Sequence, residues 1–279
     1  QEEVIWVKNE NYFDADKVYI TKVNGKYNAQ ADSIAPEMFL RGEIDSCSVT
    51  TNILDEWLNG DNAQYVHQSK KLGTIMYMLF NFNPKMEDEA ANEAYRAAVN
   101  NKNWRMSIVY GLNKAYCLSA YDPYYAEERV TNLMIPADFA MVDGKDYTEF
   151  GNLPELSKGF YDEAKALEFR DAAKAELEAA GVPLPIQIPV FYNPSTPNMN
   201  NSFQLIEKQL EELLGTDYID ITVYAGPTTN FIGEVRRPGK WGLYEQGWSP
   251  DYADPATYFE PFGYGWTFGS QEYIEGDEY

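Results

Sequence analysis

Residues 186–224 read IQIPVFYNPSTPNMNNSFQLIEKQLEELLGTDYIDITVY, in which two apolar runs flank a helical pattern. The runs at 186–192 and 218–224 have the length and the β-branched and aromatic content of strands. Between them, apolar residues recur at the spacing of one helix face, namely at Phe203, Ile206, Leu210 and Leu213. A strand, a helix and a second strand in succession predict an α/β layer in which helices pack on a sheet.

The same alternation extends in both directions from this stretch. Residues 229–235 predict a short helix and residues 241–247 a strand that ends at a glycine. Asp162 begins the clearest helix pattern, which runs to Ala180 and ends at Gly181. Further upstream we predict strands at 4–7, 18–23, 44–49 and 73–82, a turn at Asn24-Gly25, and helices at 33–41 and 51–58.

Two further segments complete the expected order of elements. Residues 87–118 have a helical signal in two pieces, with Asn103 as the expected cap of the second. Residues 119–160 are rich in Tyr, Pro, Gly and Asp and predict a long irregular segment. In the apolar run at 73–82 we expect burial on both faces, with Met76 and Met78 in the core.

Composition narrows the class of protein. The 279 residues suggest about two domains. A net charge of −22 disfavours nucleic acid and anionic membrane as partners. Aromatic residues make up 15% of the chain, which suits recognition of small molecules or peptides and is also ordinary core filling. Two cysteines are too few for a disulfide framework, and no apolar run is long enough for a signal peptide or a membrane helix.

A search for catalytic or cofactor motifs returns no strong match. His67 is the only histidine, in a strand-like run where we expect it to face solvent, so no zinc spacing is present and any catalytic triad depends on that residue. No phosphate-binding glycine loop and no EF-hand loop occurs. We therefore expect neither a cofactor nor a metal. The 44 acidic residues leave a glycoside hydrolase with paired carboxylates open.

Residues 244–262, YEQGWSPDYADPATYFEPF, form the expected ligand-facing turn. Asp254-Pro255 reads as a helix start, which leaves Asp251 on the loop between Trp248 and Tyr252. A carboxylate framed by aromatic rings suits a cationic partner. The alternative, in which Asp251 only caps a turn and the aromatic residues are core, stays equally open.

Four stretches, in the same order, resemble a known family. They are 39–45 (FLRGEID), 103–114 (NWRMSIVYGLNK), 161–165 (YDEAK) together with 178–181 (EAAG), and 247–255 (GWSPDYADP). They are similar to motifs of the family 5 extracellular solute-binding proteins, the receptors of oligopeptide and dipeptide ABC importers. The second motif departs from the family's usual residues at Ser107, Gly111, Asn113 and Lys114, and Glu163 replaces a proline in the third.

The resemblance implies an α/β fold of the periplasmic-binding-protein-like type, class II and cluster C. Family members are longer, so we expect a partial two-lobe structure, a fragment that lacks the front of the first lobe and the final return segment. Residues 1–80 would then be part of lobe I, and 81–279 most of the second lobe.

The resemblance also implies a function without catalysis. The chain would capture short peptides by hinge closure and deliver them to membrane permease subunits, as a monomer outside the cell, lipid-anchored or periplasmic. A carbohydrate-binding relative, a carboxylate-dependent glycoside hydrolase and an extracellular interaction module remain alternatives.

Site residues follow from the same motifs. The resemblance implies that Asp251 meets the peptide's α-ammonium, with Trp248 lining a side-chain pocket and Tyr252 beside it. Some receptors of the family place arginines twelve and three residues before this tryptophan, where they meet the ligand's carboxylate. Here these positions are Arg236 and Glu245. The second departs from the pattern and makes a non-peptide ligand more plausible, while Arg236 also fits a solvated helix end.

Overall fold

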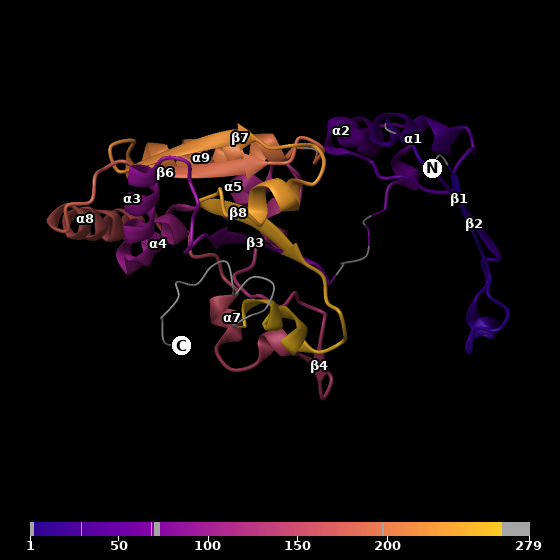
Figure 1. Ribbon diagram of the computed structural model, residues 1–279. Coiled ribbons are helices and arrows are strands. Elements are labelled where there is room, and N and C mark those ends of the chain that lie inside the picture. The colour runs from indigo at the N-terminus through magenta and orange to yellow at the C-terminus, as the bar shows by residue number, and fades with distance from the viewer. Residues whose placement is uncertain (1–2, 29, 68, 70–72, 197, 264–279) are drawn as a thin grey trace. The chain divides into compact units, whose positions relative to one another are not determined.

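The computed structural model describes residues 3–28, 30–67, 69, 73–196 and 198–263 (Figure 1). The chain divides into two compact units, residues 1–69 and residues 70–279. Each unit has its own secondary structure. The assignment of residues 1–80 and 81–279 to two lobes of a larger protein stays a prediction.

The first unit begins with an antiparallel hairpin of β1 (Glu3–Val7) and β2 (Lys22–Lys26). The predicted strand at 4–7 is confirmed, whereas the second strand begins later than the predicted residue 18. The turn predicted at Asn24-Gly25 is wrong, because these residues pair with Ile5 and Val4 inside the hairpin. A side chain at Gly25 would meet the Trp6 ring at 2.7 Å, so the glycine makes room for that indole.

Helices follow the hairpin in the first unit. The connection between the strands contains η1 (Ala15–Lys17), and after β2 come α1 (Ala31–Leu40), α2 (Thr51–Asn59) and η2 (Ala63–Tyr65). The helices predicted at 33–41 and 51–58 are confirmed, and Gly42 after α1 has a φ of 73°. The strand predicted at 44–49 is wrong, since the chain bends there and pairs with no described strand. His67 is exposed, as expected, but lies in irregular chain rather than in a strand.

A four-stranded sheet organises the second unit. Its order is β3 (Ile75–Phe80), β8 (Leu243–Trp248), β6 (Ile186–Tyr192) and β7 (Ile219–Ala225). β6 is parallel to both β7 and β8, whereas β3 is antiparallel to β8. Four predicted strands are confirmed, each end to within two residues: those at 73–82, 186–192, 218–224 and 241–247.

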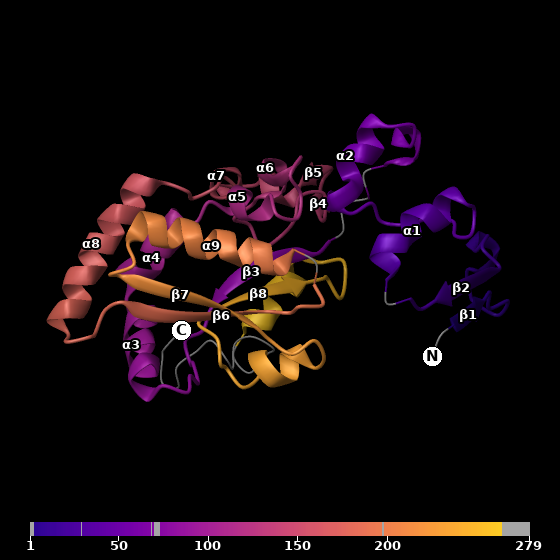
Figure 2. The same cartoon turned by 90° about the horizontal axis from the view of Figure 1, so that it is seen from above.

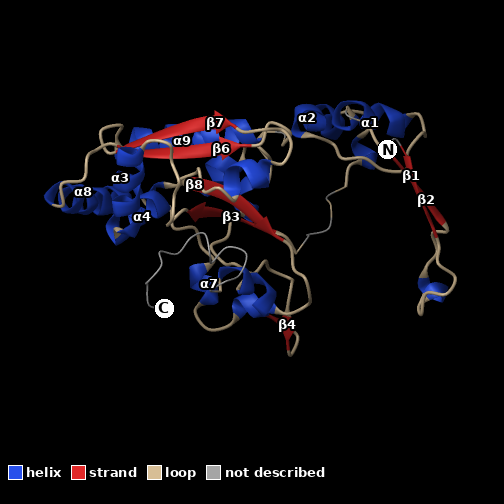
Figure 3. Cartoon of the chain, viewed as in Figure 1, coloured by secondary structure: helices blue, strands red, loops and turns tan. Residues whose placement is uncertain are grey.

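Helices cover this sheet (Figures 2 and 3). α9 (Met199–Leu214) runs alongside β6 and β7, α3 (Glu89–Asn100) contacts β6, and α4 (Lys102–Gly111) packs along α8 (Glu163–Ala179). On α9, Phe203, Ile206 and Leu210 are buried and Leu213 is partly buried, so the predicted helix face is the one that packs. These contacts form the largest apolar core of the unit.

The segment at 87–118 differs from the prediction in its number of helices. It forms three, α3, α4 and α5 (Lys114–Leu118), rather than two. The cap of α4 is Asn101, whose Oδ1 accepts a hydrogen bond of 3.0 Å from the amide of Trp104. Asn103 lies inside α4 and donates instead to Glu176 on α8, at 2.9 Å. The Asp162 cap of α8 is confirmed, because its Oδ1 accepts from the Lys165 amide at 3.0 Å.

β3 is only partly buried, in contrast to the expected burial of both faces. It lies at an edge of the described sheet, so its alternate side chains reach different environments. Met78 packs against the core as predicted, whereas Met76 is 57% exposed. Met76 lies over Gly247 on β8, where a side chain would meet its Sδ at 2.7 Å.

Residues 119–160 are largely irregular, as predicted. Their short elements are α6 (Ala126–Arg129), β4 (Met141–Val142), β5 (Lys145–Asp146), η3 (Tyr147–Glu149) and α7 (Leu153–Leu156). Two buried carboxylates organise the segment. Asp122 forms an ion pair of 2.9 Å with Arg129, and Asp146 accepts hydrogen bonds from the amides of Asp138 and Thr148 at 2.6 and 2.8 Å.

Candidate functional site

The carboxyl ends of β6, β7 and β8 point to the same edge of the sheet. This follows from the parallel pairing of β6 with both neighbours. The loops that leave this edge begin at residues 193, 226 and 249. In open α/β sheets, ligands bind outside the carboxyl ends of the strands. A ligand site is therefore expected at this edge of the sheet.

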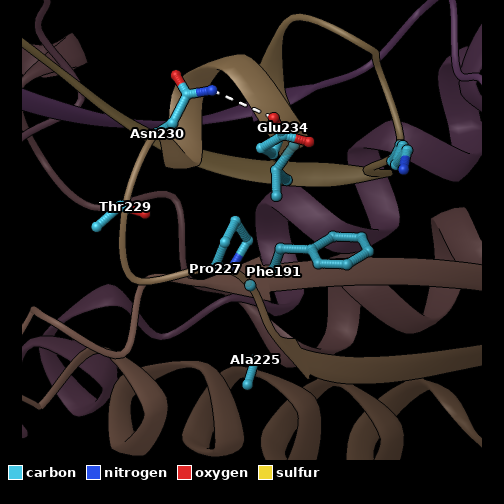
Figure 4. A pocket seen from close by; sticks show the side chains of 9 residues that line it. Phe191, Ala225, Pro227, Thr229, Asn230 and Glu234 are labelled. Atoms are coloured by element: carbon cyan, nitrogen blue, oxygen red, sulfur yellow. Dashed lines mark hydrogen bonds between the residues drawn. The ribbon is translucent and has the colours of Figure 1, made fainter.

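A hollow of about 430 Å³ lies at this edge, beyond β6 and β7 (Figure 4). Phe191, at the end of β6, forms part of its wall and stacks on Tyr224 with ring centroids 5.2 Å apart. Asn230 Nδ2 donates a hydrogen bond of 3.2 Å to Glu234 Oε1, and both residues lie on the same side of the hollow. The hollow is lined by Phe191, Ala225, Gly226, Pro227, Thr229, Asn230, Glu234, Val235 and Lys240.

Sequence reasoning missed this hollow. Its walls come from the end of β6, the loop after β7 and η4 (Ile232–Arg236), which are far apart in the chain. The helix predicted at 229–235 is present as this short π-helix, and it forms one wall. The sequence does contain a local sign of the loop that borders the hollow, because Gly226-Pro227 directly follows a strand. In the structure, Asn230 of the same loop has a left-handed φ of 55°.

The turn that carries Asp251 is held by two polar contacts. Asp254 Oδ1 accepts from the Ala256 amide at 2.8 Å, so the predicted cap is confirmed for the short helix η5 (Pro255–Tyr258), which leads into η6 (Glu260–Phe262). The amide of Asp251 donates a hydrogen bond of 3.0 Å to Oγ1 of the buried Thr257. The backbone of Asp251 is thus fixed by the structure around it.

The Asp251 side chain itself is exposed. Among the described residues, no lysine or arginine forms an ion pair with its carboxylate and no group donates a hydrogen bond to it. The neighbouring Tyr252 is 43% exposed. A hydrogen bond to Glu260 is the largest of the effects that raise the pKa of Tyr252 to about 12, and the negative charge of Asp251 contributes. The turn therefore presents an exposed carboxylate beside a ring.

Trp248 lies half-buried at the end of β8. It packs with Ile75, Ile135 and Tyr258 in a small apolar cluster. At this end of the strand pair, the hydroxyl groups of Thr74 and Ser249 form a hydrogen bond of 2.7 Å. The indole thus forms part of the wall behind the turn, and its predicted contact with a ligand stays a prediction.

Arg236 is buried, with 7% of its surface exposed, so the alternative of a solvated helix end is wrong. The reason is that η4 packs against the sheet: the Trp241 indole Nε1 donates to the Arg236 carbonyl at 3.0 Å. Val235 and Phe231 of the same segment pack on Tyr244. Burial raises the pKa of Tyr244, and the positive charge of Arg236 opposes this effect in part.

Glu245 lies on the other face of β8. Successive side chains of a strand point to opposite faces, so Tyr244 and Trp248 share one face and Glu245 takes the opposite one. Across the strand pair it opposes Met78, which packs in the main core. Glu245 therefore points to the opposite face of β8 from Trp248.

Within the described residues, no group of three or more His, Cys, Asp or Glu side chains is arranged to hold a metal ion. The same part of the chain contains no helix with the length and apolar content of a membrane span.

The profile of the family described as bacterial extracellular solute-binding proteins, family 5 middle, matches residues 1–270. The chain belongs to this family. The predicted membership of this family is thereby confirmed.

Relatives in the family share modest identity with this chain. The oligopeptide-binding protein AliA of Streptococcus pneumoniae is 28% identical over 288 residues, which cover 92% of this chain and 43% of AliA. The oligopeptide-binding protein SarA of Streptococcus gordonii is 27% identical, over 91% of this chain and 43% of SarA. The chain thus spans less than half the length of these family members.

The fold is likewise that of the family. The structure of Listeria monocytogenes OppA bound to peptide matches with a TM-score of 0.68 at 20% identity, over 98% of this chain and 49% of OppA. This likeness confirms the predicted α/β, periplasmic-binding-protein-like fold with partial coverage of a two-lobe protein. The named relatives favour the peptide hypothesis and lend no support to a carbohydrate-binding protein or a glycoside hydrolase.

Proposed function

We propose that this chain is part of the extracellular substrate-binding component of an ABC importer and captures short peptides. The observation that carries the proposal is the exposed carboxylate of Asp251, which has no ion-pair or hydrogen-bond partner among the described residues. It lies on a backbone fixed by Thr257 at the carboxyl edge of the sheet. A fixed anion of this kind suits the α-ammonium of a peptide, which it binds by charge-assisted hydrogen bonds.

Other residues of the same edge have roles in the proposal. Trp248 and Tyr252 supply apolar and aromatic surface beside the ammonium, and the hollow next to Phe191 accepts a ligand side chain. Arg236 supplies positive charge that attracts the ligand's carboxylate. An extended ligand would bond mainly through its backbone, so that many sequences fit.

The proposed mechanism is capture without chemistry. Two lobes close on a hinge and bury the peptide, and the closed form is recognised by the permease subunits. We propose that the protein works as a monomer, without enzymatic activity, outside the cell and held at the membrane by a lipid or within a periplasm. Support comes from the family, whose members bind solutes outside the cell, and from relatives named as oligopeptide-binding proteins.

Calorimetry on the full-length gene product tests the proposal with tri- to pentapeptides. Asp251→Asn should weaken binding by ~1.5–3 kcal/mol, the range of a hydrogen bond to a charged group. N-acetylation of the peptide should have a similar effect on the wild type and little effect on the variant. Glu168→Gln, which removes an exposed carboxylate from α8, is the matched control. Equal affinities of the wild type and Asp251→Asn would remove Asp251 from this role.

A further inference from the structure

β7 lies at one edge of the described sheet, where its only strand partner is β6. The backbone groups of successive residues in a parallel strand point alternately to its two sides. The Tyr218 carbonyl accepts from the Ile186 amide, just before β6, at 3.0 Å. The Gly226 amide donates to the Tyr192 carbonyl, at the end of β6, at 2.9 Å. The even-numbered residues of β7 therefore face β6, and the odd-numbered residues turn their N–H and C=O groups outward.

The outward side of β7 is suited to pairing with another strand. Its sequence, IDITVYA, is β-branched and aromatic and contains a single charge, which favours strand pairing. Among the described residues, the outward amides of Val223 and Ala225 have no hydrogen-bond partner. Unpaired backbone groups in a row are a template for a strand of another molecule. This edge therefore needs protection if the protein is to stay monomeric.

A side chain of α9 provides a partner for the outward amide in the middle of the strand. The amide of Ile221 donates a hydrogen bond of 2.7 Å to Oε1 of Glu211. Glu211 is half-buried, because α9 packs alongside β6 and β7. A carboxylate that accepts from a backbone amide forms a charge-assisted hydrogen bond. A strand from another molecule would have to displace this bond before it could pair along β7.

Two further carboxylates lie close to Glu211. Glu207 is one helical turn before it on α9, and Asp220 directly precedes Ile221. Burial raises the pKa of Glu207, and the negative charges of Glu211 and Asp220 contribute. Among the described residues, no lysine or arginine forms an ion pair with any of these three. A second copy of the strand would bring the same charges towards them, and like charges that face each other across a strand pair are destabilising.

We propose that Glu211 caps the open edge of β7 and, together with Glu207 and Asp220, prevents this edge from pairing with the same edge of a second copy. A second copy is the partner that the edge fits, because two identical edges related by a two-fold axis are self-complementary. The inference goes beyond peptide capture. It concerns self-association, and it stands whether or not the protein binds peptides.

The test removes the cap and measures the mass of the full-length gene product. Glu211→Ala removes the acceptor, whereas Glu211→Gln retains an oxygen that accepts from the Ile221 amide. Glu212→Ala, which removes an exposed carboxylate from the next position of α9, is the matched control. Light scattering after size exclusion, over a wide range of protein concentration, should show monomers for the wild type, Glu211→Gln and Glu212→Ala. The mass of Glu211→Ala should rise with concentration to that of a dimer or beyond.

A second substitution shows whether the association uses this edge. A lysine on an edge strand disfavours pairing, and Thr222 is exposed on β7, so Thr222→Lys should return Glu211→Ala to a monomer. The inference is overturned if Glu211→Ala stays monomeric at every concentration. It is also overturned if Thr222→Lys leaves the association of Glu211→Ala undiminished, because unfolding rather than edge pairing would then cause it.

Hydrogen exchange of the wild type keeps the inference testable if Glu211→Ala does not fold. Mass spectrometry with fragmentation that resolves single amides should show that the Ile221 amide exchanges at least about tenfold more slowly than the outward amide of Val223. Equal exchange rates of the two amides would mean that Glu211 does not hold the edge, and the inference would fail. Neither measurement involves a peptide, so its outcome leaves the proposed function untouched.

Discussion

The backbone amide of Asp251 donates a hydrogen bond of 3.0 Å to Oγ1 of Thr257, six residues further along the chain. Thr257 is fully buried, and Asp251 is exposed. The contact therefore joins the core to the tip of the turn. It fixes the backbone that carries the carboxylate and leaves the carboxylate itself available, an arrangement that reduces the entropy lost when a ligand binds.

Thr257→Val tests this relationship, because valine keeps the shape of threonine and removes the acceptor. The Asp251 amide then loses its partner, and we expect a loss of about 1 kcal/mol in the free energy of unfolding. Peptide affinity should fall as well, since the turn is less ordered. Denaturant unfolding and calorimetry measure the two effects. The control is Thr222→Val, at an exposed position on β7, which should change neither the free energy of unfolding nor the peptide affinity. If Thr257→Val also leaves both quantities unchanged, the hydrogen bond is dispensable.

Glu245 should make stability depend on pH. Burial raises the pKa of Glu245 above its ordinary value of 4.5, so the folded state binds this proton more tightly than the unfolded state. The stability from the protonated form is then fully present below pH 4.5 and is lost as pH rises through the folded pKa. The neighbouring Cys117 and Tyr121 have raised pKa values and stay neutral over this range.

We therefore expect Glu245→Gln to be more stable than the wild type at pH 7.5 and to lose most of that advantage at pH 4. Urea unfolding of both proteins at the two pH values checks this expectation. Glu168→Gln on α8 serves as a control for the loss of one negative charge. An equal difference between wild type and Glu245→Gln at both pH values would mean that the carboxylate is ionised throughout.

Local patterns were sufficient to predict much of the fold. The strand at 186–192 is found with those bounds, and the helix face of Phe203, Ile206 and Leu210 is buried, because apolar periodicity reports directly on which side faces a core. Asp162 and Asp254 were also predictable as caps, since a cap acts over two or three residues. The strand pairing of the hairpin could not be predicted in the same way. Asn24-Gly25 is a strong turn signal, yet both residues pair with β1, and Gly25 leaves space for the Trp6 ring.

The site was predictable only in its local part. The turn around Asp251 is encoded by consecutive residues, whereas the hollow depends on which strands become neighbours in the sheet. Burial of Arg236 depends on how η4 packs. Separation of Glu245 from Trp248 follows from strand alternation, because positions three apart point to opposite faces, and the sequence contained that signal. Its neighbours Cys117 and Tyr121 come from a distant segment and were not foreseeable.

Tyr95 links α3 to the sheet. The side chain is fully buried, and its hydroxyl donates a hydrogen bond of 2.5 Å to the carbonyl of Gly242, just before β8. Tyr95→Phe leaves that carbonyl without this donor and should lower the free energy of unfolding by about 1 kcal/mol. Thermal unfolding compared with Tyr161→Phe, which removes an exposed hydroxyl bonded to Glu163, measures the effect. Equal melting temperatures of the two variants would contradict it.

Gly242 offers a sharper test of the same contact. A β-carbon at this position would meet Tyr95 Cε2 at 2.9 Å, Ile188 Cγ2 at 3.1 Å and Pro189 Cδ at 3.3 Å. All three belong to packed side chains near the start of β8, so Gly242→Ala overpacks the region and should cost about 1–3 kcal/mol in the free energy of unfolding. Gly159→Ala is the matched control, because nothing lies within 4 Å of its added carbon. The denaturant midpoints of both variants, compared with that of the wild type, measure the effect. If the Gly242→Ala protein is as stable as Gly159→Ala, α3 and β6 shift apart at little cost. The close approach of Tyr95 would then not hold α3 in place.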